Sequence, residues 1–415
     1  MKKSLLAASL AVSAITTSYG SGYQLNLAGL RQLAMGGTGT AWSWDAATIF
    51  YNPAGLSRLN GVQVYASGLL LMPATAFSNQ SQAGMETASE LTKRQTFTPF
   101  SLYVGGPIQQ DSRFALGLGI YTPFGSGLTW RDNWLGKYMV QNVRLRTVFF
   151  QPTVSYRISE RLSVGAGFVY GAGTFDYTAA LPVHGTLGPG IDDGQINMNA
   201  SASGVGYNVG VQYRATENLQ FGISYRSQVN MNIGSGTAKF TVPGSLRDSF
   251  PNTTFDTQLP CPGVISAGVG WRHNDLTLQF DLNYTGWNSF DSLRFNFAQH
   301  TSVLQDMHAP RHYRNTLTAR VGACYKVSRT VAFMGGAAFD PTPVSNGYVS
   351  PDLPDADRFV VTAGISVKPL TGFTVIAAFE GVTTGKRNAS YDFGGFSGTY
   401  QTQAINPGLA IYYNF

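Results

Sequence analysis

Charged residues, cysteines and long hydrophobic runs are all scarce in this 415-residue sequence. Only 12% of the residues are Asp, Glu, Lys or Arg, whereas a soluble domain averages about 25%. No stretch after the N-terminus reaches the ~18 uninterrupted apolar residues that a membrane-spanning helix needs, which excludes a helical membrane protein. The formal net charge of +6 comes without a basic cluster, so the sequence does not predict nucleic-acid binding.

Residues that carry out catalysis or bind metals are also few. Cys261 and Cys324 are the only cysteines; an exported protein can form a disulfide, but we favour unpaired thiols because Cys324 falls within a predicted strand. His308 and His312 have the i, i+4 spacing of metal ligands, but Pro310 between them forbids a continuous helix, so we expect no metal site. Without a Gly-x-Ser-x-Gly motif or a P-loop, we expect neither an enzyme nor a cofactor.

The N-terminus has the pattern of an export signal. Lys2 and Lys3 precede an apolar run, and Ser18 and Gly20 supply the small residues of a cleavage site. We therefore predict that residues 1–20 are a signal peptide, too short to cross a bilayer.

Glycine and aromatic residues are abundant instead, with 48 Gly, 21 Tyr and 26 Phe. Low charge with many aromatics suits a barrel that is apolar outside and polar inside. In the last segment of the chain, Leu409, Ile411, Tyr413 and Phe415 share one face. Such a half-apolar final strand is typical of an outer-membrane β-barrel, in which the last strand closes against the first.

Residues 276–285 alternate between apolar and polar over ten positions, about the length with which a tilted strand crosses a bilayer. We predict that their apolar side chains face lipid and their polar side chains face the lumen. A soluble sandwich shows the same alternation, so one strand does not decide. Aromatic–basic pairs before tight polar turns indicate an interfacial girdle; they are Tyr156-Arg157, Tyr213-Arg214, Trp271-Arg272 and Tyr325-Lys326.

Short and long connections alternate along the chain, as in transmembrane barrels. Six tight turns and seven long loops predict an all-β fold: a 14-stranded antiparallel transmembrane β-barrel over residues 62–415, with both chain ends on the periplasmic side. The tight turns are expected near residues 107–113, 159–161, 215–218, 273–275, 328–330 and 368–372. The long polar connections include Pro73–Pro99, Thr122–Val143, His184–Met198 and Gln299–Arg314.

Residues 21–61 show no strand alternation and many small residues. A lumen of 14 strands is too wide for the side chains of the wall to fill. Gly36 and Gly37 allow close packing of the backbone. We therefore predict that residues 21–61 form an N-terminal hatch, or plug, inside the lumen.

Several motifs in this segment resemble the hatch of the FadL family, which comprises outer-membrane channels for long-chain fatty acids and other hydrophobic compounds. The resemblance covers essentially the whole mature chain. It implies a 14-stranded barrel with a hatch, passive transport across the bacterial outer membrane, and a lateral exit through an interrupted strand. The hatch motifs are Ser21-Gly22-Tyr23-Gln24-Leu25-Asn26, Ala34-Met35-Gly36-Gly37-Thr38-Gly39 and Asn52-Pro53-Ala54-Gly55-Leu56.

The resemblance also implies roles for hatch residues. Tyr23 takes the position of an aromatic residue that the family places in its internal ligand pocket. Asn52, Pro53 and Ala54 match a hatch element of the family, with a helix stop and a structural turn as the alternative.

The third predicted strand, Phe114–Tyr121, runs into Pro123, Phe124 and Gly125. Because Pro cannot donate to a strand ladder and Gly weakens one, a gap that serves as a lateral gate is reasonable here. An ordinary loop start is the alternative.

One departure from the family concerns ligand charge. The fatty-acid members have a basic residue late in the fifth strand, but the matching stretch Phe175–Leu181 contains none. A second family cation matches Arg314, or less well Arg311. The missing base favours aromatic or other neutral hydrophobic ligands.

The expected partners are hydrophobic small molecules such as fatty acids or neutral hydrocarbons, outer-membrane lipid and lipopolysaccharide, and the barrel-assembly machinery, which would read Phe415. We expect a monomer and no bound nucleic acid. Two alternatives stay open: a general or substrate-selective aqueous porin and, less favoured, an outer-membrane lipid hydrolase.

Overall fold

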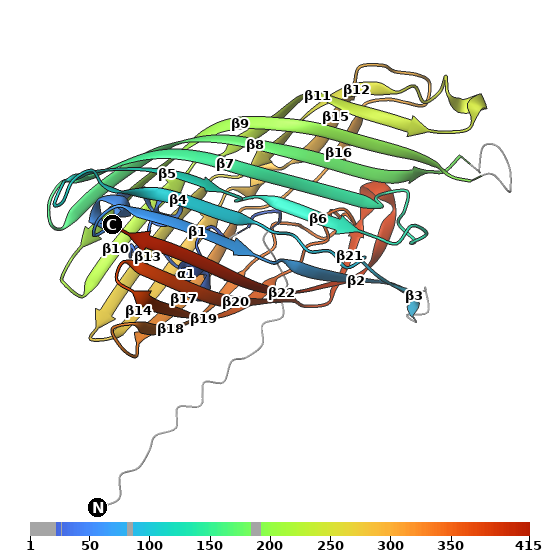
Figure 1. Cartoon of the computed structure of the whole chain (residues 1–415). Helices are drawn as coiled ribbons and strands as arrows, with labels where there is room; N and C mark the ends of the chain where they lie inside the picture. Colours follow the sequence, from blue (N-terminus) through green and yellow to red (C-terminus); the bar gives the residue numbers. More distant parts are fainter. Residues whose placement is uncertain (1–21, 26, 81–85, 184–191) are drawn as a thin grey trace, which may run out of the picture.

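The computed structural model describes residues 22–25, 27–80, 86–183 and 192–415 of the chain (Figure 1). The predicted signal peptide, residues 1–20, lies outside these ranges. None of the helices in the described ranges is long and apolar enough to span a membrane.

The strands of the described residues form one closed antiparallel ring. The first strand pairs with the last, from Gln63 opposite Asn414 to Leu69 opposite Gly408, so the ring has no free edge. The predicted all-β, 14-stranded barrel is confirmed. The fourteen strands are β1 (Gln63–Leu69), β4 (Phe100–Pro107), β5 (Phe114–Tyr121), β7 (Asn142–Arg157), β8 (Leu162–Leu181), β9 (Gly194–Arg214), β10 (Leu219–Arg226), β13 (Val264–His273), β14 (Leu276–Thr285), β17 (Thr316–Lys326), β18 (Val331–Asp340), β19 (Arg358–Leu370), β20 (Phe373–Thr384) and β22 (Phe396–Asn414).

All six predicted tight turns join consecutive strands of this ring. Both ends of the barrel chain lie at this same end, where the backbone N–H of Phe415 donates to the carbonyl of Val62 at 2.9 Å. Along β14, Thr277, Gln279 and Asp281 are buried inside while the apolar residues between them are exposed, as the alternation predicted. We refer to the end of the barrel that carries the six tight turns as the tight-turn end.

Further strands prolong the ring at the opposite end (Figure 1). The long polar connections predicted at Pro73–Pro99, Thr122–Val143, His184–Met198 and Gln299–Arg314 are therefore wrong in part, because each contains paired strand. Residues 184–191 of the third connection lie outside the described residues. In these strands the outward side chains are polar and apolar ones such as Met231, Phe255 and Phe297 are buried inside, so strand pairing continues where the lipid-facing alternation has ended. These strands are β2 (Met72–Gln80), β3 (Glu86–Leu91), β6 (Gly125–Thr129), β11 (Val229–Thr241), β12 (Thr253–Cys261), β15 (Ser292–Phe297), β16 (Met307–Pro310) and β21 (Arg387–Tyr391).

Short helices complete the structure. Three of them lie in the N-terminal segment: α1 (Leu30–Ala34), α2 (Thr48–Tyr51) and the 3-10 helix η1 (Pro53–Arg58). The others connect strands: η2 (Gly244–Leu246), η3 (Trp287–Ser289) and η4 (Asp392–Gly394).

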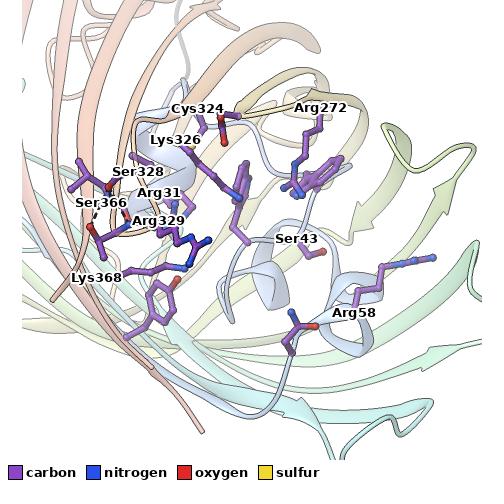
Figure 2. A pocket seen from close by; sticks show the side chains of 18 of the residues that line it. Arg31, Ser43, Arg58, Arg272, Cys324, Lys326, Ser328, Arg329, Ser366 and Lys368 are labelled. Atoms are coloured by element: carbon purple, nitrogen blue, oxygen red, sulfur yellow. Dashed lines mark hydrogen bonds between the residues drawn. The ribbon is translucent and has the colours of Figure 1, made fainter. Parts of the chain in front are cut away.

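The described residues of the segment 22–61 lie inside the ring, and nearly all of their side chains are buried. They hydrogen-bond to strands on different sides of the barrel, among them β9, β14 and β19. Arg31, Ser43 and Arg58 of this segment line a cavity at the tight-turn end (Figure 2). The segment thus fills the lumen at the position predicted for the hatch, and we use that name for it below.

Candidate ligand pocket and wall gap

The wall of the barrel is interrupted between β5 and β6. Both strands pair with β7, through Tyr121 opposite Phe149 and Gly125 opposite Arg146. Residues 122–124 between them belong to neither strand. The third predicted strand therefore breaks at Pro123 and resumes, which differs from a simple loop start.

The side chain of Thr147 occupies the gap on the β7 side. Its Oγ1 accepts from the backbone N–H of Phe124 at 3.3 Å and donates to the carbonyl of Phe124 at 2.7 Å. A hydroxyl thus replaces part of the backbone ladder at this point.

The N-terminal tail of the hatch covers the gap from inside. The N–H of Gly125 donates to the carbonyl of Tyr23 at 3.0 Å, and the N–H of Leu25 donates to the carbonyl of Pro123 at 2.8 Å. An isolated antiparallel bridge between Gln24 and Phe124 lies between these bonds. The tail is therefore paired with the interrupted strand.

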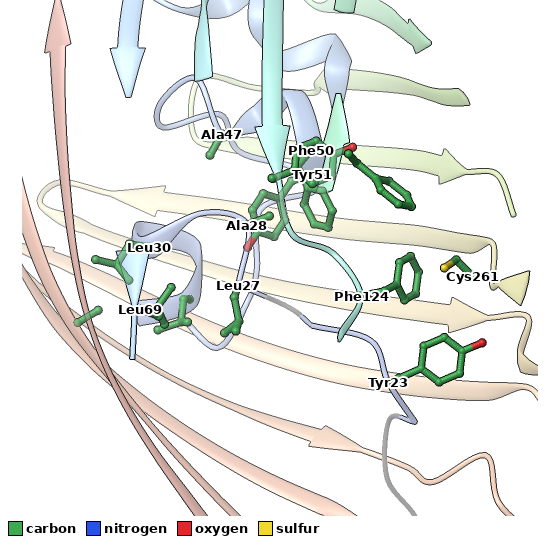
Figure 3. Close-up of a cluster of buried hydrophobic side chains, with 14 of the residues drawn as sticks. Tyr23, Leu27, Ala28, Leu30, Ala47, Phe50, Tyr51, Leu69, Phe124 and Cys261 are labelled. Atoms are coloured by element: carbon green, nitrogen blue, oxygen red, sulfur yellow. The ribbon is translucent and has the colours of Figure 1, made fainter. Parts of the chain in front are cut away.

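Tyr23 lies in a cluster of aromatic rings, and only 3% of its surface is exposed. Its ring centroid is 4.9 Å from that of Trp287, 5.4 Å from Phe290 and 6.1 Å from Phe124. Its hydroxyl donates to the carbonyl of Pro260. Burial raises the pKa of Tyr23 well above its ordinary value, so the phenol stays neutral. Figure 3 shows Tyr23 and Phe124 beside each other, with Cys261 nearby. We call Tyr23, Phe124, Trp287 and Phe290 the aromatic pocket.

Arg311 lies beside this pocket, with its guanidinium 5.9 Å from the ring centroid of Phe290. It forms a two-pronged ion pair with Asp352: Nη2 to Oδ2 is 2.8 Å and Nη1 to Oδ1 is 3.1 Å. Burial alone would raise the pKa of Asp352, but the charge and hydrogen bonds of Arg311 outweigh it and hold that pKa below its ordinary value. The charge of Arg311 is thus already matched by a carboxylate of the protein.

Arg314, which the sequence ranks before Arg311, is placed differently. Its side chain is exposed, and its backbone N–H donates to the carbonyl of Pro343 at 2.8 Å. The structure thus brings Arg311 to the aromatic pocket and leaves Arg314 outside it. Whether either residue binds ligand stays a prediction.

The predicted hatch glycines make close backbone contacts with the wall. Gly36 and Gly37 have φ of +70° and +84°, which non-glycine residues rarely adopt. A Cβ on Gly36 would lie 2.6 Å from the carbonyl oxygen of Val321 and 2.7 Å from that of Ala337. The N–H of Gly36 donates to Oγ1 of Thr362 at 2.9 Å.

Asn52 both caps a helix and ties it to the wall. Its Oδ1 accepts from the N–H of Ala54 at 3.2 Å, and Pro53 takes the first position of η1. Its Nδ2 donates to the carbonyl of Val211 in β9 at 3.0 Å and to that of Thr40 at 2.8 Å. Asn52 therefore takes part in a turn and also links the hatch to the barrel wall.

Sequence reasoning missed several residues that position the hatch. Asp281 was assigned to the lumen face but to no partner; its Oδ2 accepts from the N–H groups of Gly39 at 2.8 Å and Thr40 at 3.0 Å. Asp352 lies in the Pro-rich loop between β18 and β19, where no pattern marked it as the partner of Arg311. The polar alternation of β14 is the one signal that could have singled out Asp281.

The cysteines and histidines do not form a possible metal site within the described residues. Cys261 and Cys324 are both buried and unpaired, as predicted. Nδ1 of His312 lies 2.6 Å from Oδ1 of Asp291, and Nε2 of His308 lies 3.3 Å from Nε of Arg294. Within the described ranges, no group of three or more His, Cys, Asp or Glu side chains could hold a metal ion.

A closed barrel with a polypeptide plug and a break in its wall defines a class of outer-membrane channel. Residues 10–415 match the family described as outer membrane protein transport protein (OMPP1/FadL/TodX). The chain belongs to this family of outer-membrane transporters of hydrophobic compounds.

Individual relatives are distant but nearly complete in length. The long-chain fatty acid transport protein of Escherichia coli O6:H1 is 23% identical over 399 residues, which cover 88% of this chain and 87% of that protein. The crystal structure of a Pseudomonas aeruginosa FadL homologue matches with a TM-score of 0.79 at 20% identity, over 95% of this chain and 100% of that one. The toluene transporter TbuX of Ralstonia pickettii matches with a TM-score of 0.69 at 18% identity, over 93% and 98%.

Proposed function

We propose that this protein carries neutral hydrophobic molecules, aromatic compounds among them, passively across the outer membrane without catalysing a reaction. The extracellular loops capture the molecule, the aromatic pocket binds it, and the gap at residues 122–124 releases it sideways into the membrane. The observation that carries this proposal is the tail: residues 23–25 join the aromatic pocket to the gap through backbone hydrogen bonds.

The charge arrangement favours neutral ligands over fatty acids. Phe175–Leu181 has no basic residue, and Arg311 is paired with Asp352 at 2.8 Å. A fatty-acid carboxylate would have to break this buried pair and leave Asp352 without a partner, which is costly. A toluene-like ring or an alkane needs no such exchange.

Burial of apolar surface can supply the driving force. Transfer from water is worth ~0.8 kcal/mol per CH₂, so a chain of about fifteen methylenes gains roughly 12 kcal/mol. Capture is then favourable and release becomes the slow step. A ligand that packs against the ring of Tyr23 shifts the tail, and the tail in turn uncovers the gap.

The gap is tested with the variant Pro123→Thr/Gly125→Thr, whose residues can continue a strand. We expect a folded barrel that binds a labelled neutral alcohol of sixteen carbons but transfers it to cells far more slowly. Gly68→Ala is the matched control, because a Cβ on this other wall glycine meets nothing within 4 Å. Normal uptake by the folded double variant would show that the ligand leaves by another route.

The alternative function, an aqueous porin, makes a separate prediction. A porin carries a steady ionic current in planar bilayers, whereas a lumen filled by residues 22–61 should carry little. Large single-channel conductance by the purified protein would favour the porin. Release of fatty acid from phospholipid micelles would favour the lipid hydrolase, for which the sequence offers no nucleophile motif.

A further inference from the structure

A second cavity lies on the opposite side of the hatch from the extended strands, at the tight-turn end. Its volume is about 640 Å³, and residues of the turns at 273–275 and 328–330 line it. Hatch residues, including Arg31 and Arg58, form its inner wall. Its described lining residues include seven basic side chains and one carboxylate, that of Asp275. We call this cavity the basic cup.

Most of these positive charges form no ion pair within 4 Å in the described residues. Arg31 pairs with Asp45, at 3.6 Å. Within the described ranges no carboxylate lies within 4 Å of a nitrogen of Lys326, Arg329 or Lys368. The barrel side chains Lys326, Arg329 and Lys368 extend toward the hatch side of the cup (Figure 2).

The positively charged side chains of the basic cup repel one another. Lys326 lies within electrostatic range of both Arg272 and Lys368. Burial, with added repulsion from Arg214 and Arg157, lowers the pKa of Arg58 to about 10. Like charges held together in this way are destabilising unless an anion joins them.

Hydrogen bonding in the cup is also incomplete. Buried donors without a hydrogen-bond partner among the described residues occur on Trp44 (Nε1) and Arg58 (Nη2). The guanidinium of Arg272 stacks 4.0 Å from the ring centroid of Trp42, and its Nε donates to Thr277 at 3.3 Å. Stacking fixes its plane, while no described residue accepts from its terminal nitrogens. The terminal nitrogens of Arg272 are therefore available to an acceptor in the cup.

We propose that the basic cup binds a small, multiply charged anion that bears phosphate groups, and that this anion bridges the hatch to the barrel wall. The volume lies within the range of small-molecule sites, about 300–1,000 Å³. Guanidinium groups match the geometry of phosphate oxygens, and several cations together favour more than one negative charge. Arg58 would hold the anion from the hatch, and Arg329 and Lys368 from the wall.

The site is tested by titrating the purified full-length barrel, in a neutral detergent and 150 mM NaCl, with pyrophosphate in a calorimeter. We expect saturable binding of one pyrophosphate per chain. Arg329→Gln/Lys368→Gln changes two exposed side chains, so the fold is kept, and it should weaken binding at least about tenfold, because each charge-assisted bond is substantial. Arg161→Gln, an exposed cation in a neighbouring tight turn that does not line the cup, is the matched control.

Two further measurements separate the sources of the phosphate and test the bridge. In nanodiscs, phosphatidylglycerol but not phosphatidylcholine should weaken pyrophosphate binding if lipid headgroups occupy the cup; equal binding in both would identify a free solute. Pyrophosphate should slow hydrogen exchange of hatch amides in the wild type but not in the double variant. Absent saturable binding, equal binding by wild type and double variant, or unchanged exchange would overturn the proposal.

Discussion

Arg311 shows how one partner decides what a buried cation can do. Its side chain is 5% exposed and lies beside the aromatic pocket, where a ligand carboxylate would need it. The carboxylate of Asp352 already accepts hydrogen bonds from both terminal nitrogens of its guanidinium. Arg311, the less favoured of the two predicted ligand cations, is therefore bound within the protein's own structure here.

Neutralising Asp352 should change ligand preference. In Asp352→Asn the amide keeps one hydrogen bond to Arg311 but removes the competing charge. Binding of a sixteen-carbon fatty acid should strengthen about tenfold, since a charge-assisted hydrogen bond is worth ~1.5–3 kcal/mol, while binding of the matching alcohol stays constant. Paired titrations measure this. Arg314→Ala serves as the control and should alter neither; equal gains for acid and alcohol would assign Asp352 a purely structural role.

Asp357 gives a pH-dependent contribution to stability. Burial and the neighbouring Asp355 raise the pKa of Asp357 from its ordinary 3.8 to about 7. The folded protein therefore holds a proton that the unfolded chain releases between pH 4 and 7. This contribution is complete below about pH 4 and is lost as the pH rises to about 7.

Asp357→Asn should remove this dependence. The Tm of the wild type should fall relative to that of the variant as the pH increases from 5 to 8. Thermal melts of both proteins in detergent at matched ionic strength provide the measurement. Asp248→Asn, on an exposed aspartate, should show no such trend, and a pH-independent difference at Asp357 would contradict the assigned titration.

At the scale of elements, the hatch has little regular structure and depends on the wall. Its longest helix, η1, has six residues, far below the length at which a helix is stable alone. Side chains of the wall take its free backbone groups, as Asp281 does for Gly39 and Thr40. The hatch is thus a chain segment whose conformation the barrel imposes.

Removing Asn52 should loosen the hatch without opening the ring. Asn52→Ala deletes the cap of η1 and the bonds to Thr40 and Val211, and each buried partner left unsatisfied costs about 1–3 kcal/mol. Limited proteolysis should cut residues 22–61 faster, while the barrel keeps its heat-stable migration in gels. Asn60→Ala, at an exposed hatch position, is the control. Unchanged hatch cleavage would mean that other contacts suffice.

At the scale of the whole molecule, local patterns predicted the barrel but not its internal contacts. Alternation and tight turns depend on neighbours in sequence, so the ring of strands and all six turns were predictable. The strand pairs of the extended end were not, because their outward side chains are polar and their apolar side chains face inward, so they lack the pattern of a lipid-facing strand.

The site was predictable only in outline. The break near Pro123 follows from local chemistry, since proline lacks an N–H. The pairing of Leu25 with Pro123 and of Arg311 with Asp352 joins residues far apart in the chain. No periodicity records such contacts, so the sequence could rank Arg314 before Arg311 although the fold brings only Arg311 to the pocket.

The tail contributes a residue to the pocket, a cover to the gap and a link between the hatch and the barrel wall. Deleting it is the sharpest test of whether it binds ligand and controls the gap. Deleting residues 22–25 behind an intact signal peptide should leave a heat-stable barrel, because the ring begins at Gln63. Uptake should fall, because the pocket loses Tyr23, whose ring contacts are worth ~0.5–1.5 kcal/mol each, and ligand binding can no longer move the tail that controls the gap. Tyr23→Phe keeps the ring and loses only the hydroxyl bond to Pro260, so its uptake should stay near normal. Full-rate uptake by the deletion variant would show that the tail neither binds ligand nor controls the gap.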